Sequence, residues 1–212
     1  MDHPIALVHI PKTAGTSIRT ALAGHFGLER CSFNYGTDYQ DVRSVNPLFS
    51  AGHVPASSML KRNPGARLLT CVRNPLHRLI SLDRFLHKWA AIKDSGTYAW
   101  YRQTHPDLPQ LAAEREKHFG GCIRQFLDVS PQEFAAIVRH EHLAIDWPLA
   151  LKRLGLPPLE LQHIHRGEPY RDYSAEELAR ARGVLADEFA CYERYARIGS
   201  KRLRFPIPAH GE

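Results

Sequence analysis

An apolar segment, a short loop and a helical pattern near the start of the chain constrain the fold most strongly. The run over residues 5–8 is typical of a buried strand, and residues 9–17 after it read His-Ile-Pro-Lys-Thr-Ala-Gly-Thr-Ser. Ile18, Leu22 and Phe26 then recur at the i, i+4, i+8 spacing of one helix face. A strand, a tight loop and a helix in this order predict an anion site. The first backbone N–H groups of a helix have no partner within it, and the helix dipole adds about half a positive charge there.

The loop differs from the Walker A phosphate loop. In that motif the lysine directly follows a glycine, whereas Lys12 precedes Gly15 by three residues and no glycine lies upstream of it. Gly15 lacks the Cβ that would keep the backbone away from a ligand. The expected anion-binding residues are Lys12, Thr13, Ala14, Gly15, Thr16 and Ser17. A helix N-cap with an incidental lysine is the alternative interpretation.

A second unit of the same kind surrounds Arg73, which ends another apolar run. Asn74 and Pro75 follow as an N-cap and a first helical position, and a helix of about four turns is predicted after them. Ser81 lies roughly 9 Å along this helix at 1.5 Å per residue, so Arg73 and Ser81 could reach one phosphate group. Arginine donates two hydrogen bonds in a planar fork and serine adds a third. The alternative is a salt-bridged arginine at a strand end and a surface serine.

Two strand-loop-helix units with short connections predict an α/β fold with a central parallel sheet flanked by helices. A chain of 212 residues is expected to form one domain over residues 1–212. The net charge of +6 favours anionic ligands, although it does not select among nucleotide, nucleic acid, glycan and lipid headgroup.

The four cysteines lie far apart in the sequence, which predicts reduced thiols and no zinc site. Four residues precede the first strand, so we expect no signal peptide. No apolar run approaches the roughly 18 residues that a transmembrane helix needs. We therefore expect a cytoplasmic protein, and the sequence leaves its oligomeric state open.

The remaining segments carry weaker signals. A Ser-Pro pair at Ser130 and a capping box at Ser174 each indicate the start of a helix. The sequence predicts a loop over residues 31–45, a short strand over 49–55, a helical turn over 57–60, a variable surface insertion over 93–119, a helix from Ser130 towards Arg139, a helix over 147–154 and a long helix over 174–196.

Together, the two anion-binding motifs resemble those of sulfotransferases that use 3′-phosphoadenosine 5′-phosphosulfate (PAPS). The stretch Pro11 to Ser17 is similar to their 5′-phosphosulfate-binding loop, and Arg73-Asn74-Pro75 with Ser81 is similar to their 3′-phosphate-binding motif. The resemblance implies a P-loop NTPase-like sulfotransferase fold, with PAPS as co-substrate and 3′,5′-adenosine bisphosphate (PAP) as product. Lys12 would neutralise charge on the bridging oxygen as the sulfuryl group leaves, and no metal is expected.

The segment Ala51-Gly52-His53-Val54 resembles the Gly-His segment of the glycan O-sulfotransferase branch, in which the histidine is the catalytic base. The resemblance implies that His53 removes the proton of an acceptor hydroxyl. An imidazole with an ordinary pKa near 6.5 suits that task at neutral pH. A core or surface histidine is the alternative for His53, and His9 and His77 are rival candidates for the base.

Later segments extend the resemblance over nearly the whole chain. The stretch Leu161 to Arg166 is similar to a late His-Leu-Asn-Arg segment that in relatives lies near the adenine and the 3′-phosphate. This implies that Arg166 and Gly167 contact the nucleotide. The ending Glu188-Phe189-x-x-Tyr192 is similar to an Asp-Phe-x-x-Tyr ending of the family.

The sequence therefore predicts a PAPS-dependent sulfotransferase whose partners are the nucleotide and a hydroxyl acceptor, with no nucleic acid. A carbohydrate or a small hydroxylated metabolite is the expected acceptor, while lipid-linked sugar and peptide tyrosine stay open. One alternative is a P-loop kinase of a small molecule, which would need a magnesium-holding carboxylate at a strand end. The other is a non-catalytic module that binds anions or glycans.

Overall fold

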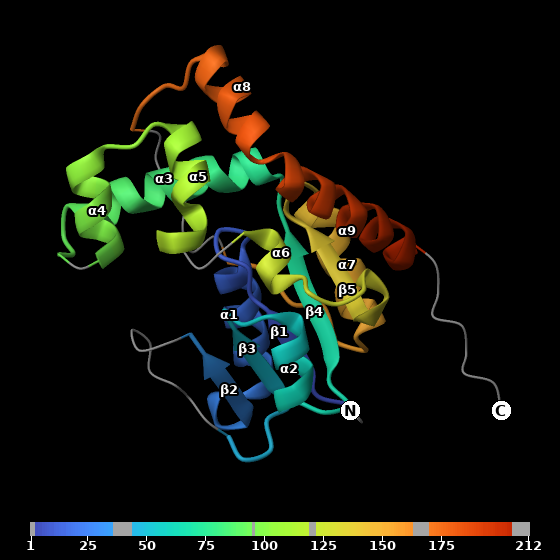
Figure 1. The fold of residues 1–212 in the computed structure, drawn as a ribbon. Helices are drawn as coiled ribbons and strands as arrows, with labels where there is room; N and C mark the ends of the chain where they lie inside the picture. The colour runs from blue at the N-terminus through green and yellow to red at the C-terminus, as the bar shows by residue number, and fades with distance from the viewer. Residues whose placement is uncertain (1–2, 36–43, 95, 119–121, 163–169, 205–212) are drawn as a thin grey trace.

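The computed structural model of the protein describes residues 3–35, 44–94, 96–118, 122–162 and 170–204. A five-stranded sheet in the order β2-β3-β1-β4-β5 forms its centre (Figure 1). The strands are β1 (Ile5–Val8), β2 (Cys31–Asn34), β3 (Phe49–Gly52), β4 (Arg67–Val72) and β5 (Phe134–Arg139). Every neighbouring pair is parallel, so the predicted single α/β domain with a central parallel sheet is confirmed.

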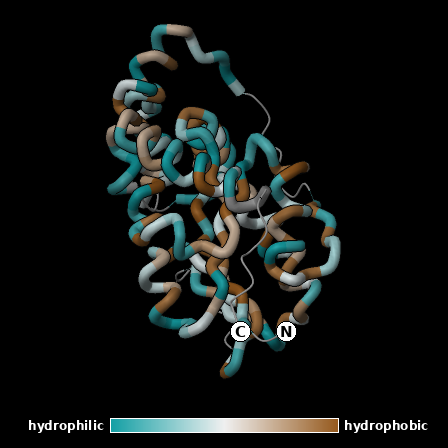
Figure 2. Tube along the Cα trace, turned by 90° about the vertical axis from the view of Figure 1, so that its right-hand side faces the viewer, coloured by the Kyte–Doolittle hydropathy of each residue, from teal (hydrophilic) through white to brown (hydrophobic). Residues whose placement is uncertain are grey.

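Helices connect these strands and cover both faces of the sheet (Figure 1). The α-helices are α1 (Gly15–Phe26), α2 (Ala56–Arg62), α3 (Pro75–Ala90), α4 (Gly96–Thr104), α5 (Leu108–His118), α6 (Ile123–Phe126), α7 (Leu143–Arg153), α8 (Ala175–Val184) and α9 (Ala186–Arg204). Short 3-10 turns are η1 (Leu28–Arg30), η2 (Pro131–Glu133) and η3 (His140–His142). Figure 2 shows hydrophobic and hydrophilic residues alternating along the helices, as expected for helices that cover a buried sheet.

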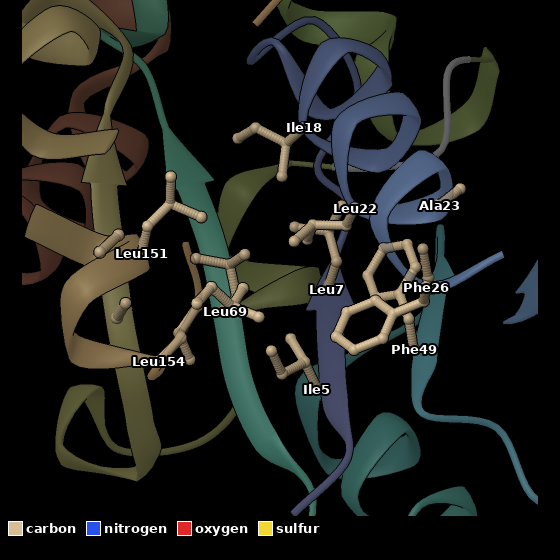
Figure 3. Close-up of a cluster of buried hydrophobic side chains, with 14 of the residues drawn as sticks. Ile5, Leu7, Ile18, Leu22, Ala23, Phe26, Phe49, Leu69, Leu151 and Leu154 are labelled. Carbon is tan, nitrogen blue, oxygen red and sulfur yellow. The ribbon is translucent and has the colours of Figure 1, made fainter. Parts of the chain in front are cut away.

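The two faces of the sheet carry alternate residues of each strand. On one face, Leu7 and Leu69 pack with Leu22 of α1 and Leu151 of α7 (Figure 3). On the opposite face, Val8 belongs to a second cluster with residues of α2, α6 and α9. Both faces are buried because side chains of successive strand residues point to opposite sides.

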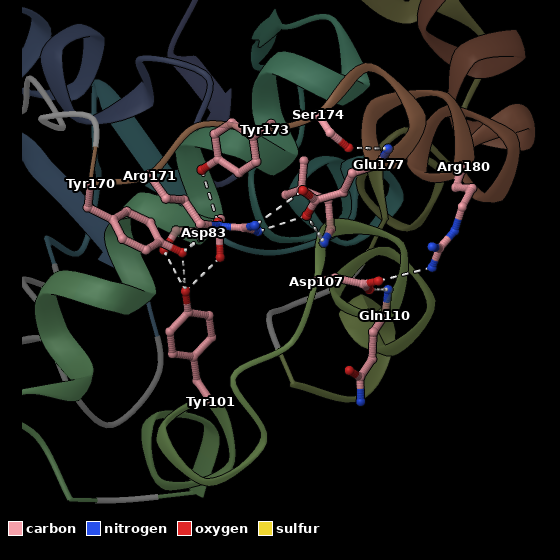
Figure 4. A network of polar contacts seen from close by, with 11 residues as sticks. Asp83, Tyr101, Asp107, Gln110, Tyr170, Arg171, Tyr173, Ser174, Glu177 and Arg180 are labelled. Atoms are coloured by element: carbon pink, nitrogen blue, oxygen red, sulfur yellow. Dashed lines mark hydrogen bonds and ion pairs between the residues drawn. The ribbon is translucent and has the colours of Figure 1, made fainter.

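A third core lies between α3, α4, α5 and α8, which Figure 1 shows grouped beyond the sheet. Its centre holds a fully buried carboxylate, Asp83 (Figure 4). The hydroxyls of Tyr101, Tyr170 and Tyr173 lie 2.6, 2.7 and 2.9 Å from its oxygens, and Nη2 of Arg171 lies 3.2 Å away. These contacts connect α3 with α4 and with the segment that precedes α8.

Several local predictions are confirmed. The side-chain oxygen of Asn74 accepts hydrogen bonds from the backbone N–H groups of Leu76 and His77 at 3.0 and 3.3 Å, so Asn74 caps α3 as predicted. The Ser174 hydroxyl caps α8 by accepting a hydrogen bond from Glu177 N at 3.1 Å. The sequence alone was therefore sufficient to predict these two helix N-caps.

Two strands lie where the sequence predicted other structure. The helix predicted from Ser130 to Arg139 is wrong, because the Ser-Pro signal leads only into the 3-10 turn η2, and β5 follows directly. The run Phe-Ala-Ala-Ile-Val-Arg pairs with β4, and a short apolar run does not distinguish a buried strand from a buried helix. The loop predicted over residues 31–45 is wrong at its start, where β2 pairs with β3 and buries alternate residues.

Two helical regions also differ from expectation. The segment 93–119 contains α4 and α5, and it buries Tyr101, Leu108 and Leu111 in the third core. That this segment varies among relatives stays a prediction. The single helix predicted over 174–196 is two helices that meet at Leu185, because α8 packs on α5 while α9 packs on β5. The helix predicted over 147–154 begins earlier, as α7.

Within the part of the chain that the structure describes, no helix is both long and apolar enough to cross a membrane. All four cysteines are free thiols, and three of them are buried.

Candidate active site

The candidate site lies where β3, β1 and β4 end at the same edge of the sheet. The loop of residues 9–14 follows β1, His53 follows β3 and Arg73 follows β4. Open α/β sheets bind ligands at the carboxyl ends of their parallel strands. The strand order therefore brings Lys12, His53 and Arg73 to one edge, although they are far apart in the sequence.

The backbone of the loop is held in an unusual conformation. Lys12 and Ala14 have φ angles of 67° and 72°, which non-glycine residues adopt at a cost on the order of 1–3 kcal/mol each. Ala14 is also the N-cap of α1, and its methyl group cannot accept a hydrogen bond from the first-turn amides. Those amides are therefore left for an acceptor other than the cap residue.

Three successive carbonyl groups of the loop accept hydrogen bonds from side chains. The bonds are Thr13 Oγ1 to Ile10 O at 2.8 Å, Arg78 Nε to Pro11 O at 3.0 Å and Arg73 Nη1 to Lys12 O at 3.2 Å. These bonds hold the loop in its strained form. The Thr13 side chain is buried and gives its hydroxyl proton to Ile10, so Thr13 can donate to a ligand only through its backbone N–H.

A buried ion network supports the loop from the interior of the protein. Arg78, which holds the Pro11 carbonyl, lies 3.4 Å from the carboxylate of Glu188 in α9. Arg115 of α5 lies 2.7 Å from the other oxygen of Glu188. All three side chains are almost fully buried, and the network connects α5, α9, α3 and the loop.

Gly15 has a packing role in the structure. A Cβ at this position would lie 2.0 Å from Cδ2 of His9, so the glycine lets α1 begin directly against the His9 ring. The sequence had suggested ligand approach as the reason for this glycine. The contact with His9 is a sufficient physical reason by itself.

Gly52 and His53 are fixed by β2. The backbone N–H of His53 donates to the Asn34 carbonyl at 3.1 Å, and a Cβ at Gly52 would lie 2.4 Å from that same carbonyl oxygen. His9 N–H donates to Gly52 O at 3.0 Å. Position 52 therefore requires a glycine, because the end of β2 lies too close for a Cβ.

The ring of His53 has a defined proton position. Its Nδ1 lies 2.6 Å from the backbone carbonyl of His9, and a carbonyl only accepts hydrogen bonds, so Nδ1 carries the proton in the neutral ring. Nε2 then holds a lone pair, as a proton acceptor requires. Burial lowers the pKa of His53 below 6.5, and the charges of Arg19 and Arg78 lower it further, against the raising effect of the His9 hydrogen bond. His53 is therefore neutral at pH 7.

The two rival histidines have different surroundings. His9 is 5% exposed, its ring centre lies 4.4 Å from that of His53, and its Nδ1 lies 2.8 Å from the Tyr35 hydroxyl. Burial lowers the pKa of His9 well below 6.5, with smaller contributions from nearby positive charges. The His77 side chain is 59% exposed and faces Glu141, with Nδ1 3.9 Å from its carboxylate. His9 is thus enclosed in the packing under the loop, and His77 is turned towards Glu141.

Lys12 is a half-buried cation without a carboxylate partner in the described part of the chain. Its Nζ lies 4.3 Å from the centre of the Phe85 ring, a distance typical of a cation–π contact. Burial, together with a smaller effect of the Arg73 charge, lowers the pKa of Lys12 to about 8. Lys12 is therefore charged at pH 7 but loses its proton more easily than an ordinary lysine.

Arg73 and Ser81 remain available to a ligand. The Nε atom of Arg73 is buried and has no hydrogen-bond partner, and burial is the main cause of its lowered pKa. Ser81 is half-buried in α3, and its hydroxyl forms no hydrogen bond with the described residues. The same holds for the half-buried hydroxyls of Thr16 and Ser17 in the first turn of α1. Arg166 and Gly167 lie outside the described residues.

Sequence reasoning missed several residues of this site. Phe85 follows Ser81 at i+4 and Arg78 precedes it at i−3, so the helix period alone could have placed both on the same side of α3. Tyr35 and Glu188 gave no such signal. They reach the site only through the pairing of β2 with β3 and through the packing of α9.

Comparison with known proteins identifies the family. The family model described as "Sulfotransferase family" matches residues 1–150, which is more than half of the chain. The chain therefore belongs to the sulfotransferase family. No curated protein matches its sequence.

Two solved structures are similar to the chain at low identity. One is the crystal structure of the mouse sulfotransferase SULT7A1 complexed with PAP, with 12% identity and a TM-score of 0.38, covering 90% of this chain and 66% of the mouse chain. The other is the sulfotransferase from Alicyclobacillus acidocaldarius, with 14% identity and a TM-score of 0.43, covering 97% of this chain and 100% of that one.

Proposed function

We propose that the protein transfers a sulfuryl group from PAPS to the hydroxyl of an acceptor. The observation that carries the proposal is the combination, at one edge of the sheet, of a neutral imidazole with a fixed proton position and cations that form no ion pair with a described carboxylate. These groups are His53, Lys12 and Arg73. Family membership supports the same reaction class.

The donors at the edge fit a ligand with two separate anionic groups. The first-turn amides of α1 and Lys12 would hold the 5′-phosphosulfate, and Arg73 with Ser81 would hold the 3′-phosphate. The buried Nε of Arg73, which lacks an acceptor, is the observation in this structure that favours such a ligand. When bound, PAPS supplies the activated sulfuryl group, and PAP is the product.

His53 would act as the general base. Its Nδ1 proton is held by the His9 carbonyl, so Nε2 is the atom that would take the proton of the acceptor hydroxyl. The lowered pKa keeps this nitrogen unprotonated at neutral pH. The His9 carbonyl would also stabilise the imidazolium that forms when Nε2 takes the proton.

Lys12 would stabilise negative charge on the leaving phosphate oxygen. Its ammonium lies on the Phe85 ring in a partly desolvated position, where a fixed charge acts more strongly than in water. A hydroxyl of a carbohydrate or of a small hydroxylated metabolite is the proposed acceptor. Sulfation of a panel of such acceptors, measured with labelled PAPS, would identify it.

Isothermal titration calorimetry with PAP and with 5′-AMP tests the proposal directly. We expect PAP to bind more tightly, because only PAP carries the 3′-phosphate. Arg73→Ala should weaken PAP binding roughly 10-fold or more, since a hydrogen bond to a charged group contributes about 1.5–3 kcal/mol.

The matched control is Arg62→Ala, which removes an exposed arginine from α2 and should leave both affinities unchanged. Equal affinity of the wild-type protein for PAP and 5′-AMP would contradict the proposal. Magnesium-dependent turnover of ATP without binding of PAP would instead favour a kinase.

A further inference from the structure

Arg84 of α3 is an arginine that has no partner among the described residues. Its side chain is half-buried, and its Nε atom is buried with no hydrogen-bond partner. It forms no ion pair or hydrogen bond with any of the described residues. Buried N–H groups are nearly always paired in native proteins, so an orphaned guanidinium nitrogen requires an explanation.

Several other buried or half-buried arginines of the chain form ion pairs with carboxylates. Arg78 and Arg115 share the carboxylate of Glu188, and Arg139 lies 2.7 Å from Asp146. The fold thus supplies carboxylates to arginines with a structural role. The acceptor for Arg84 is missing from the described protein, which points to a ligand that brings it.

The position of Arg84 in α3 connects it with the candidate site. It lies three residues after Ser81, and residues three apart are neighbours on a helix surface with Cβ atoms about 5–6 Å apart. Phe85, the next residue, supports the Lys12 ammonium. Arg84 therefore belongs to the helix surface that carries the other site residues.

Arg84 resembles Arg73 in its hydrogen bonding. The Nε atoms of both side chains are buried without a partner. Burial is the main cause of the lowered pKa of Arg73, Glu141 opposes it, and the Arg84 charge adds a smaller lowering effect, so the two guanidinium groups lie near each other. Like charges that lie near each other repel, and an anion between them would reduce the repulsion and accept the missing hydrogen bonds.

We propose that Arg84 binds the 3′-phosphate of PAPS together with Arg73 and Ser81, and thereby selects nucleotides that carry this phosphate. The inference rests on the proposed function. A phosphate monoester carries about 1.5 to 2 negative charges at pH 7, so two arginines match its charge better than one. The 5′-phosphosulfate is held by the loop after β1, and Arg84 does not contribute to that end of the nucleotide.

Titration of PAP and of 5′-AMP into the wild-type protein, Arg84→Ala and Arg84→Lys tests the inference. We expect Arg84→Ala to weaken PAP binding about 10- to 100-fold and to change the affinity for 5′-AMP less than 2-fold. Arg84→Lys should give a smaller loss, about 3- to 10-fold and again confined to PAP, because lysine keeps the charge but loses the fork. Lys88→Ala, an exposed position one turn further along α3, is the control and should change neither affinity.

The outcomes separate this inference from the proposed function. If the wild-type protein does not prefer PAP over 5′-AMP, both are overturned. If the wild-type protein prefers PAP and Arg84→Ala keeps the same preference, only the role of Arg84 is overturned. An equal loss for both nucleotides in Arg84→Ala would also overturn it. Should Arg84→Ala fail to fold in a thermal unfolding assay, Arg84→Lys decides, and an unchanged PAP affinity in that variant overturns the role of Arg84.

Discussion

Two pairs of arginines in or near the candidate site differ in their partners. On the interior side, Arg78 and Arg115 share the fully buried carboxylate of Glu188 at 3.4 and 2.7 Å. Arg73 after β4 and Arg84 of α3 have no ion pair with the described residues, and each has a buried Nε without a partner. Asp187 lies 3.4 Å from Arg115 as well, so the first group has two carboxylates for two arginines, whereas the second has no ion pair with the described residues.

From this difference we infer that some cations stabilise the fold, whereas others are kept for binding a ligand. A buried cation is costly unless it is paired, so the cations that support the loop come with their carboxylate. Arg73 and Lys12 have no ion pair with the described residues. Burial is the main cause of the lowered pKa of each, and a neighbouring arginine charge, that of Arg84 for Arg73 and that of Arg73 for Lys12, contributes less. Stability should therefore depend on the first group and ligand affinity on the second.

Removal of the Glu188 carboxylate should have the largest effect on stability. Glu188→Ala leaves Arg78 buried without a carboxylate partner and leaves Arg115 with only Asp187, 3.4 Å away. Breaking a buried pair in this way costs about 3–5 kcal/mol of the free energy of unfolding. Chemical denaturation measures the loss. Glu193→Ala, at an exposed position of the same helix, should stay within about 0.5 kcal/mol of the wild type. A loss below 1 kcal/mol for Glu188→Ala would contradict the inference that stability depends on the first group of arginines.

Removal of Arg73 should affect the ligand-bound protein instead. Without ligand, we expect Arg73→Ala to change the free energy of unfolding by less than about 1 kcal/mol, because no carboxylate loses its partner. PAP at 100 times its wild-type Kd should stabilise the wild type by about 2.7 kcal/mol, and the variant by roughly 0.4–1.4 kcal/mol if its Kd is 10- to 100-fold higher. Denaturation with and without PAP measures both quantities. An equal stabilisation of both proteins would show that Arg73 does not bind the ligand.

Acidification should destabilise the protein through its two neutral histidines. The pKa values of His9 and His53 are lowered in the folded state, so below about pH 6.5 the unfolded chain binds more protons than the folded one. The free energy of unfolding should then fall by up to about 1.4 kcal/mol per pH unit for each group until the folded pKa is reached. Denaturation midpoints between pH 7 and 5 measure the slope. His53→Asn should reduce the slope, whereas the exposed His25→Asn should not.

The smallest expected effect is the pH dependence of Lys12. Its pKa of about 8 in the free protein means that the ammonium is charged below pH 8 and loses its charge above it. A bound anion raises that pKa again, so PAP binding near pH 8 should take up protons and should weaken less than 10-fold between pH 7 and 9. Calorimetry in buffers of different ionisation enthalpy detects the proton uptake, which Lys12→Met should abolish. Proton uptake that persists in Lys12→Met would assign it to another group.

Local signals predicted the parts of the fold in which one stretch of sequence decides its own structure. The run before His9, the helix after Gly15 and the Asn74-Pro75 cap all agree with β1, α1 and α3. β5 and β2 were missed, because pairing with β4 and β3 decides between strand and other structure there. The third core was missed because the residues of α4 and α5 become apolar contacts only against α3 and α8.

The sequence by itself determined the two strand-loop-helix motifs and their order, because backbone geometry at a strand-to-helix turn depends on neighbouring residues. Only the tertiary structure decided the state of each side chain in the site. The proton position of His53 depends on the carbonyl of His9, 44 residues away. The support of the loop depends on Glu188, which lies 110 residues from Arg78. Burial and charge pairing are properties of the packed molecule, so the division between paired and unpaired arginines exists only after folding.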